Sequence, residues 1–231
     1  MRIKITLLTA LLLAFSSTGF AQSRTPTFTQ YAVKVENTKN VRVNLKSHKN
    51  ANNFRTNLRN AAKEGVSDKA SFVRGDMFEA DISQATVLAL FLLPDNMMKL
   101  QSKFLDLKPG SRIVGNTFGF QDWTPDAQET ISTDCSSWCT ALLWIVPAKV
   151  EGTWQSPQGE LTLQQNHQML TGTLTAGGRS GPIAGGRLRG DQISFTVAGA
   201  EYSGRVNGDI IEGTVKAENR NATWKATRAP R

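Results

Sequence analysis

The chemistry open to this sequence begins with its histidines and cysteines, the residue types that most often bind metals or act as nucleophiles. The two histidines, His48 and His167, have no carboxylates or cysteines at metal-ligand spacing, so we interpret both as surface-turn residues and expect no metal site. Cys135 and Cys139 are four positions apart, which differs from the spacing of redox motifs. Two cysteines in a loop can approach closely enough to bridge. We therefore predict a small structural disulfide that staples the loop before the last strand of the first half.

The first 21 residues follow the pattern of a secretory signal peptide. Arg2 and Lys4 give a positive start, Ile5–Phe15 is an apolar stretch, and the small residues Gly19 and Ala21 precede the expected cut. The apolar stretch is shorter than the roughly 20 residues that a membrane-spanning helix needs. We therefore expect export to the periplasm or the exterior, with no transmembrane segment in the mature chain.

The sequence carries a formal net charge of +8, and its most basic stretch runs from Lys34 to Arg74. These charges are spread along a predicted helix and its flanks, without the interleaved aromatic residues of a single-strand binder. A solvated basic face explains them. We therefore expect no nucleic-acid partner, and instead a protein substrate or a component of the cell envelope.

The chain changes character near Val150. Before it, apolar strands alternate with helical patterns, and Thr86–Leu93 is a continuous apolar run typical of a buried parallel strand. After it, glycine is frequent and short strands are joined by tight turns such as Asn207–Gly208, which predicts an antiparallel barrel or sandwich. We therefore place an α/β domain at residues 22–150 and a small all-β domain at residues 151–231.

Four short segments of the first half carry a resemblance to a known family. They are Gly75–Phe78 after the strand Phe72–Val73, Leu92–Pro94 after the buried strand, Leu107–Gly110 before another strand, and Trp123. In order and spacing they are similar to class I S-adenosylmethionine-dependent methyltransferases. The run from Phe72 to Trp123 resembles a subgroup of protein-lysine methyltransferases related to those that act in mitochondria. The resemblance implies a partial Rossmann-like sheet with flanking helices, and S-adenosylmethionine as the cofactor of an active protein.

The resemblance also implies roles for individual residues. Asn44 stands where the family has the acidic residue that binds the ribose hydroxyls, and Asp76, Met77 and Phe78 form the turn that contacts adenine. Leu93, Pro94 and Trp123 fall on the substrate side. The residue types alone also allow simpler interpretations, with Asp76 as a turn residue, Pro94 as a strand terminator and Trp123 as a packing residue.

The cofactor side departs from the family pattern. The family's first strand is followed by a glycine-rich turn, whose glycines let the backbone approach the methionine part of the cofactor. No glycine lies between Gln22 and Asn40, and the segment is too short for a strand, a loop and a helix. Gln30–Glu36 alternates like a strand, which either fills the central sheet position or pairs as a hairpin with Val41–Leu45. Asn44 lacks the charge that strengthens a hold on a diol.

We therefore expect that catalysis is weak or lost, in which case no cofactor binds. The alternative hypothesis is a non-enzymatic periplasmic binding or scaffold module that uses the C-terminal β-domain.

Overall fold

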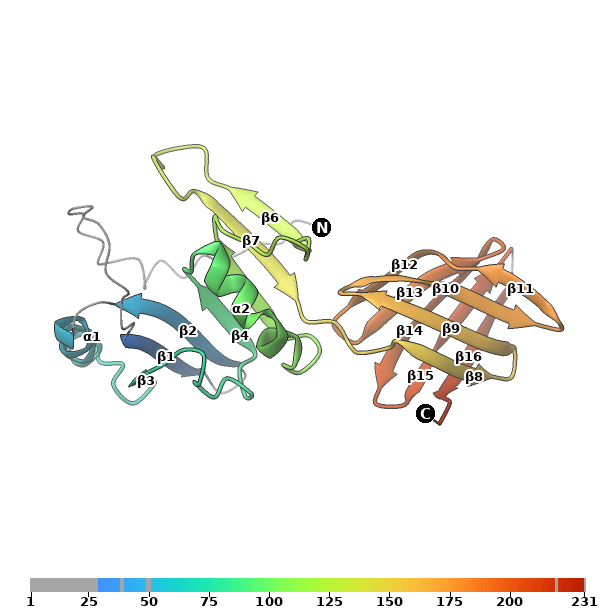
Figure 1. The fold of residues 1–231 in the computed structure, drawn as a ribbon, viewed down its shortest axis with the longest axis horizontal. Coiled ribbons are helices and arrows are strands. Elements are labelled where there is room, and N and C mark those ends of the chain that lie inside the picture. Colours follow the sequence, from blue (N-terminus) through green and yellow to red (C-terminus); the bar gives the residue numbers. More distant parts are fainter. Residues whose placement is uncertain (1–28, 38–39, 49–50, 219, 231) are drawn as a thin grey trace.

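The computed structural model describes residues 29–37, 40–48, 51–218 and 220–230. These residues form two units joined end to end, a mixed α/β sheet and a β-barrel (Figure 1). The predicted signal peptide lies outside the described residues. Within the described part of the chain, no helix is long and apolar enough to cross a bilayer.

The first unit contains a seven-stranded sheet in the order β3-β1-β2-β4-β5-β7-β6. Its helices are α1 (Ala51–Lys63) and α2 (Pro94–Leu105). Its strands, in chain order, are β1 (Thr29–Asn37), β2 (Asn40–His48), β3 (Ala70–Gly75), β4 (Val87–Leu90), β5 (Arg112–Asn116), β6 (Ala127–Thr130) and β7 (Thr140–Ile145).

Only the centre of this sheet is parallel. β2 pairs in parallel with β4, and β4 pairs in parallel with β5. At the flanks, β1 pairs antiparallel with both β2 and β3, and β7 pairs antiparallel with both β5 and β6. The expected Rossmann-like sheet with flanking helices is thus present only in part, since the described residues contain only the helices α1 and α2. β1 and β2 form the hairpin that was one of the two alternatives for Gln30–Glu36.

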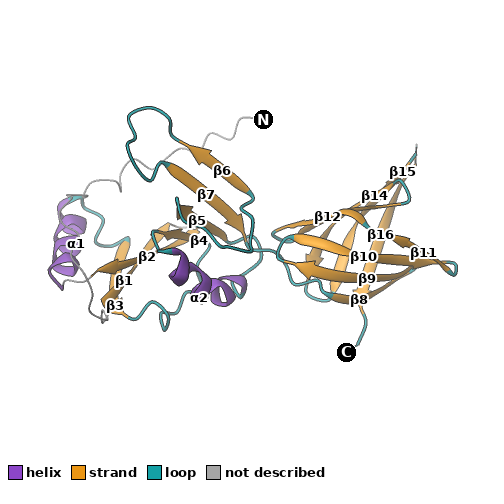
Figure 2. Cartoon of the chain, turned by 45° about the horizontal axis from the view of Figure 1, so that its top comes forward, coloured by secondary structure: helices purple, strands orange, loops and turns teal. Residues whose placement is uncertain are grey.

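Helix α2 buries one face against the central strands (Figure 2). Pro94 occupies the first turn, where its missing N–H breaks no helical hydrogen bond. Asp95 in the first turn and Lys103 in the last both complement the helix dipole. The apolar residues of α2 that enter the core recur at helical spacing: Met97, Leu100 and Phe104.

The second unit is a closed antiparallel barrel, so of the two architectures expected for the β-domain the barrel is the one observed. Its strands are β8 (Gly152–Ser156), β9 (Gly159–Asn166), β10 (Met169–Ala176), β11 (Arg179–Pro182), β12 (Ala184–Arg189), β13 (Gln192–Val197), β14 (Ala200–Asn207), β15 (Ile210–Ala217) and β16 (Arg220–Arg228). The sheet closes because β10 pairs with β9 as well as with β12, which leaves β11 as a flap on β10.

Each unit has its own hydrophobic core. The buried cluster of the first unit ends with Val146, and that of the second begins with Ala148. Residues 146–151, between β7 and β8, therefore connect the two units, and we call them the connector.

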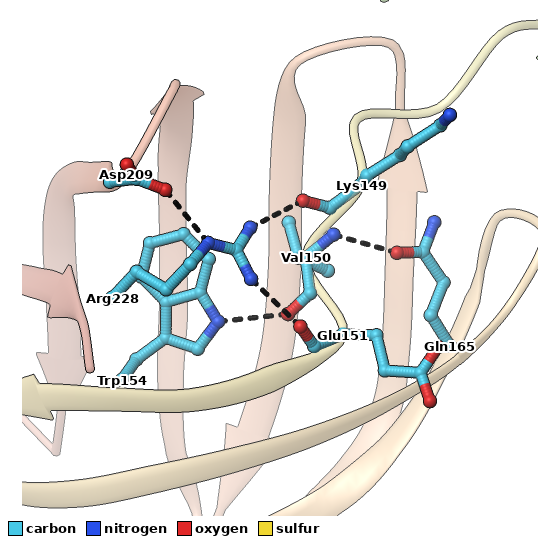
Figure 3. Close-up of polar contacts among 7 residues, drawn as sticks. All are labelled: Lys149, Val150, Glu151, Trp154, Gln165, Asp209 and Arg228. Atoms are coloured by element: carbon cyan, nitrogen blue, oxygen red, sulfur yellow. Dashed lines mark hydrogen bonds and ion pairs between the residues drawn. The ribbon is translucent and has the colours of Figure 1, made fainter. Parts of the chain in front are cut away.

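Side chains from the barrel hold the connector in place (Figure 3). Arg228 donates to the carbonyl oxygens of Lys149 and Glu151 at 2.6 and 2.7 Å. Its guanidinium carbon lies 4.2 Å from the ring centroid of Trp154, and its Nε donates to Asp209 at 2.9 Å. Hydrogen bonds and a cation–π contact thus act on the same few residues of chain.

Gln165 holds the same segment from the other side. Its amide donates to the carbonyl of Ala148 at 2.9 Å and accepts the N–H of Val150 at 2.7 Å. The indole of Trp154 donates to the carbonyl of Val150 at 2.8 Å. Because the polar backbone groups of the connector find partners in the barrel, the connector is a fixed joint rather than a loose linker.

The barrel also packs directly against the first unit. Gly190 has a φ of +64°, and a Cβ atom built there would lie 2.9 Å from Cα of Gly110, in the turn before β5. Arg187 pairs with Asp126 at 3.0 Å, and Gln168 donates to the carbonyl of Thr124 at 2.7 Å. A cleft of about 1190 Å³, lined by both units, runs beside the connector.

Candidate functional site

Four strands of the first unit end at one edge of the sheet, which we call the carboxyl edge. β2, β4 and β5 are parallel, and Gln30 lies opposite both Ser47 of β2 and Gly75 of β3, so β3 ends level with β2. The chain leaves β2 toward β3 and leaves β4 toward β5, in opposite directions along the sheet. Open α/β sheets bind ligands at such a switch point. The crevice between the ends of β2 and β4 is therefore the candidate site.

The predicted adenine turn follows β3 at this edge. Oδ1 of Asp76 accepts the backbone N–H of Phe78 at 2.9 Å, so one carboxylate oxygen is engaged within its own turn. The side chain of Met77 is 2% exposed and packs into the core, which leaves it no face toward a ligand. Phe78 is 37% exposed, and its carbonyl accepts from Nζ of Lys103 at 2.9 Å. Of these residues, Phe78 has the ring that a ligand can reach.

Asp81 lies in the connection between this turn and β4. Its Oδ1 accepts the backbone N–H of Ser83 at 2.9 Å, and the backbone and hydroxyl of Ser83 hold the pKa of Asp81 below its ordinary value. The carboxylate is therefore ionised at neutral pH and serves as a turn residue rather than as a proton donor.

The predicted substrate-side residues Leu93 and Pro94 follow β4 at the same edge. The carbonyl of Leu93 accepts the N–H groups of Asn96 and Met97 at 3.0 and 3.1 Å, which fixes the first turn of α2. The side chain of Leu93 is 63% exposed, so it projects from the edge instead of entering the core.

Asn44 lies inside β2 rather than at its end, so the predicted end of this strand was wrong. Pairing with β1 continues to His48, opposite Thr29, because the hairpin extends β2 past the apolar pattern. Asn44 itself lies opposite Val33 of β1 and Ala89 of β4. Its ribose-binding role stays a prediction.

Trp123 is not brought together with the residues that follow β4. It is 1% exposed, and its ring stacks on Phe120 at 5.1 Å and on His167 of the barrel at 5.4 Å between centroids. Its carbonyl accepts the indole N–H of Trp144 at 2.8 Å. These contacts lie at the opposite edge of the sheet, the amino edge, where the barrel joins. A substrate contact for Trp123 stays a prediction.

His167 lies in the β9–β10 turn, as predicted, but it packs against the first unit. The amide of Gln101 on α2 donates to His167 Nε2 at 2.9 Å. Within the described part of the chain, no histidines, cysteines and carboxylates gather in a group that could hold a metal ion.

Cys135 and Cys139 form a disulfide in the loop between β6 and β7, with their Cα atoms 5.9 Å apart. Within this loop the ring of Trp138 lies 5.3 Å from that of Phe91, the residue directly after β4, in an edge-to-face arrangement. The sequence pattern did not reveal this contact, because nothing in it relates the loop to the end of β4. The disulfide loop therefore belongs to the carboxyl edge.

Comparison with known proteins matches part of the first unit. The ANTKMT methyltransferase domain matches residues 28–127. A protein-lysine N-methyltransferase of Saccharolobus islandicus (strain REY15A) is 43% identical over 77 residues, which are 33% of this chain and 48% of that protein. An ATP synthase lysine N-methyltransferase of Rattus norvegicus is 33% identical over 67 residues, 29% of this chain and 31% of that protein. The chain thus spans about half or less of these relatives.

A solved structure is also similar. It is the crystal structure of an RNA methyltransferase from Salinibacter ruber in complex with S-adenosyl-L-homocysteine. The similarity has a TM-score of 0.40 and 34% sequence identity, and it covers 44% of this chain and 63% of that chain.

Proposed function

Because residues 28–127 form part of a class I S-adenosylmethionine-dependent methyltransferase domain of the lysine-methyltransferase-like kind, we propose that this chain is an exported member of the family whose catalysis is weak or lost. The observation that carries the proposal is the absence of glycine from the strands and turns that would approach the cofactor. Export rests on the first 21 residues alone, and the relatives named above suggest protein lysine as the acceptor class.

No glycine occurs between Gly19 and Gly65. This interval contains β1, β2 and the turn that leads from β2 into α1, so no glycine follows either strand before Gly65. Close approach of a backbone to a nucleoside needs residues without Cβ atoms, often in left-handed conformations. The residues present therefore do not fit S-adenosylmethionine, and we derive no methyl-transfer step through it.

The acceptor side of the crevice is better preserved than the cofactor side. Phe78, Leu93 and Pro94 all lie at the carboxyl edge, and Phe78 and Leu93 expose apolar surface there. A member of the family that has lost its cofactor cradle can still bind the segment that an active relative would modify. Binding of a lysine-bearing protein, rather than its methylation, is thus the activity that we propose for this edge.

Thermal unfolding of the mature protein with S-adenosylhomocysteine tests the proposal. A ligand at 100 times its dissociation constant adds about 2.7 kcal/mol to the free energy of unfolding, so tight binding raises the melting temperature. We expect no rise at millimolar ligand. Adenosine is the matched ligand control, and the Phe78→Ala variant shows whether any residual binding uses the predicted turn. A rise that saturates at micromolar S-adenosylhomocysteine and disappears in Phe78→Ala would contradict the proposal.

A further inference from the structure

We infer that Phe91 and Trp138 form a receptor for the lysine side chain of a protein segment, an inference that rests on the proposed function. We call these two residues the aromatic corner. Their rings come from separate segments, the end of β4 and the β6–β7 loop, and meet at 5.3 Å with an interplanar angle of 75°. Trp138 is 54% exposed, so the contact leaves much of the indole open to a ligand.

The backbone at this corner is held in an unfavourable conformation. Trp138 has a φ of +57°, and Asp134, just before the disulfide, also has a φ of +57°. The left-handed region costs about 1–2 kcal/mol for a residue with a Cβ atom, and a bulky residue there is an outlier. The Cys135–Cys139 disulfide encloses Trp138 and ties this conformation down. Strain that is maintained in this way is typical of ligand-binding positions.

The hairpin that follows the loop is fixed as well. The carbonyl of Cys139 accepts the N–H of Ile131 at 2.9 Å, and the hydroxyls of Thr130 and Thr140 lie 2.9 Å apart. The indole is thus presented from a rigid support, which reduces the entropy that binding would cost.

The charge around the aromatic corner favours a cation. Between Arg112 and Lys149 the sequence has no Lys or Arg but four carboxylates, although the whole chain is basic. Two of the four, Asp122 and Asp126, are bound to Gln101 and Arg187 at the amino edge. The other two, Glu129 and Asp134, lie exposed on the β6–β7 hairpin. An ammonium group would therefore meet both an aromatic face and a negative surface.

The surroundings of the corner also fit the apolar stem of lysine. Leu93 and Ile131 are exposed on the two segments that carry Phe91 and Trp138. A lysine side chain buries its methylene groups along such surface while its ammonium remains near polar groups. The occupant is thus a lysine-bearing protein segment, because a polyanion such as RNA would meet only carboxylates here.

Indole N–H resonances measured by NMR on the full mature protein test the inference without any cofactor. The chain has five tryptophans, and the resonance of Trp138 is assigned as the one lost in Trp138→Phe. The probe is Nα-acetyl-lysine methylamide, and the neutral control of similar length is the norleucine analogue. We expect a saturable shift of the Trp138 resonance, with norleucine at least about fivefold weaker and the other four indoles unmoved.

Two variants sharpen this test. Trp138→Leu should abolish binding of the lysine probe, observed by chemical shifts of backbone amides after β4. Cys135→Ser combined with Cys139→Ser should weaken binding severalfold while the barrel resonances keep their positions. A Trp138 resonance that ignores the lysine probe, that responds equally to norleucine, or that responds instead to polyuridylate would overturn the inference. Tight S-adenosylhomocysteine binding would overturn the proposed loss of cofactor binding without affecting this result.

Discussion

The two edges of the first sheet present tryptophan in opposite ways. At the amino edge, Trp123 is buried between Phe120 and His167, and the barrel covers it. At the carboxyl edge, Trp138 is more than half exposed and held on Phe91 by a stapled loop. Burial at the first edge serves stability, whereas exposure at the second sacrifices packing for access. The comparison teaches that the barrel is an attachment to the structural edge and leaves the edge with the candidate site uncovered.

The two tryptophans offer the largest expected contrast. Trp123→Ala removes a large buried ring from the joint and should lower the free energy of unfolding by about 3–5 kcal/mol. Trp138→Ala should lower it by about 1 kcal/mol or less, because it removes one aromatic pair at the surface. Chemical denaturation followed by circular dichroism measures both. Similar losses for the two variants would break the distinction between the edges.

Trp123→Phe separates ring packing from polarity. The indole N–H of Trp123 is buried without a hydrogen-bond partner among the described residues. Phenylalanine keeps most of the ring and removes this unpaired donor, so Trp123→Phe should cost far less than Trp123→Ala.

The close contact between Gly190 and Gly110 should give the next largest effect. Gly190→Ala adds the cost of a left-handed residue, about 1–2 kcal/mol, to a backbone clash worth about 1–3 kcal/mol. Gly208→Ala is the matched control, because Gly208 has a φ of +59° but open space around its Cα. Thermal melting should therefore show a greater loss for Gly190→Ala. Equal losses would mean that the two units do not press together at this point.

Arg228 should give the smallest of these effects on stability and the clearest one on geometry. Arg228→Ala removes two hydrogen bonds to the connector and the contact with Trp154, at a cost of about 1–3 kcal/mol. Arg228→Lys keeps the charge but not the planar fork, so it should restore little of the loss. NMR relaxation should show the two units tumbling more independently in both variants. Unchanged tumbling in Arg228→Ala would contradict a joint held by this side chain.

The sequence was most informative where hydrophobic alternation and turn residues agree. The β9–β10, β13–β14 and β14–β15 hairpins form at the predicted turns, including Asn207–Gly208. β6 was missed because all four of its residues are exposed, so it has no apolar pattern. β11 was missed because its sequence, Arg-Ser-Gly-Pro, contains a glycine and a proline, which strands rarely contain.

The candidate site was predictable only in its local parts. The turn at Asp76 and the helix start at Pro94 are encoded by neighbouring residues, so patterns revealed them. The fate of Met77 and Trp123 depended on packing against distant elements, and the sequence alone offers no register for such contacts. The same holds for the meeting of Phe91 with Trp138.

The clamp by Arg228 also has a consequence for the order in which the protein takes shape. Arg228 lies 77 and 79 positions beyond the carbonyls of Glu151 and Lys149 that it holds. A ribosome releases the connector long before β16, so the joint stays unlatched until the whole barrel has been made. The first unit must then persist on its own during synthesis, and any chain truncated before β16 would carry a swivelling barrel remnant at its end.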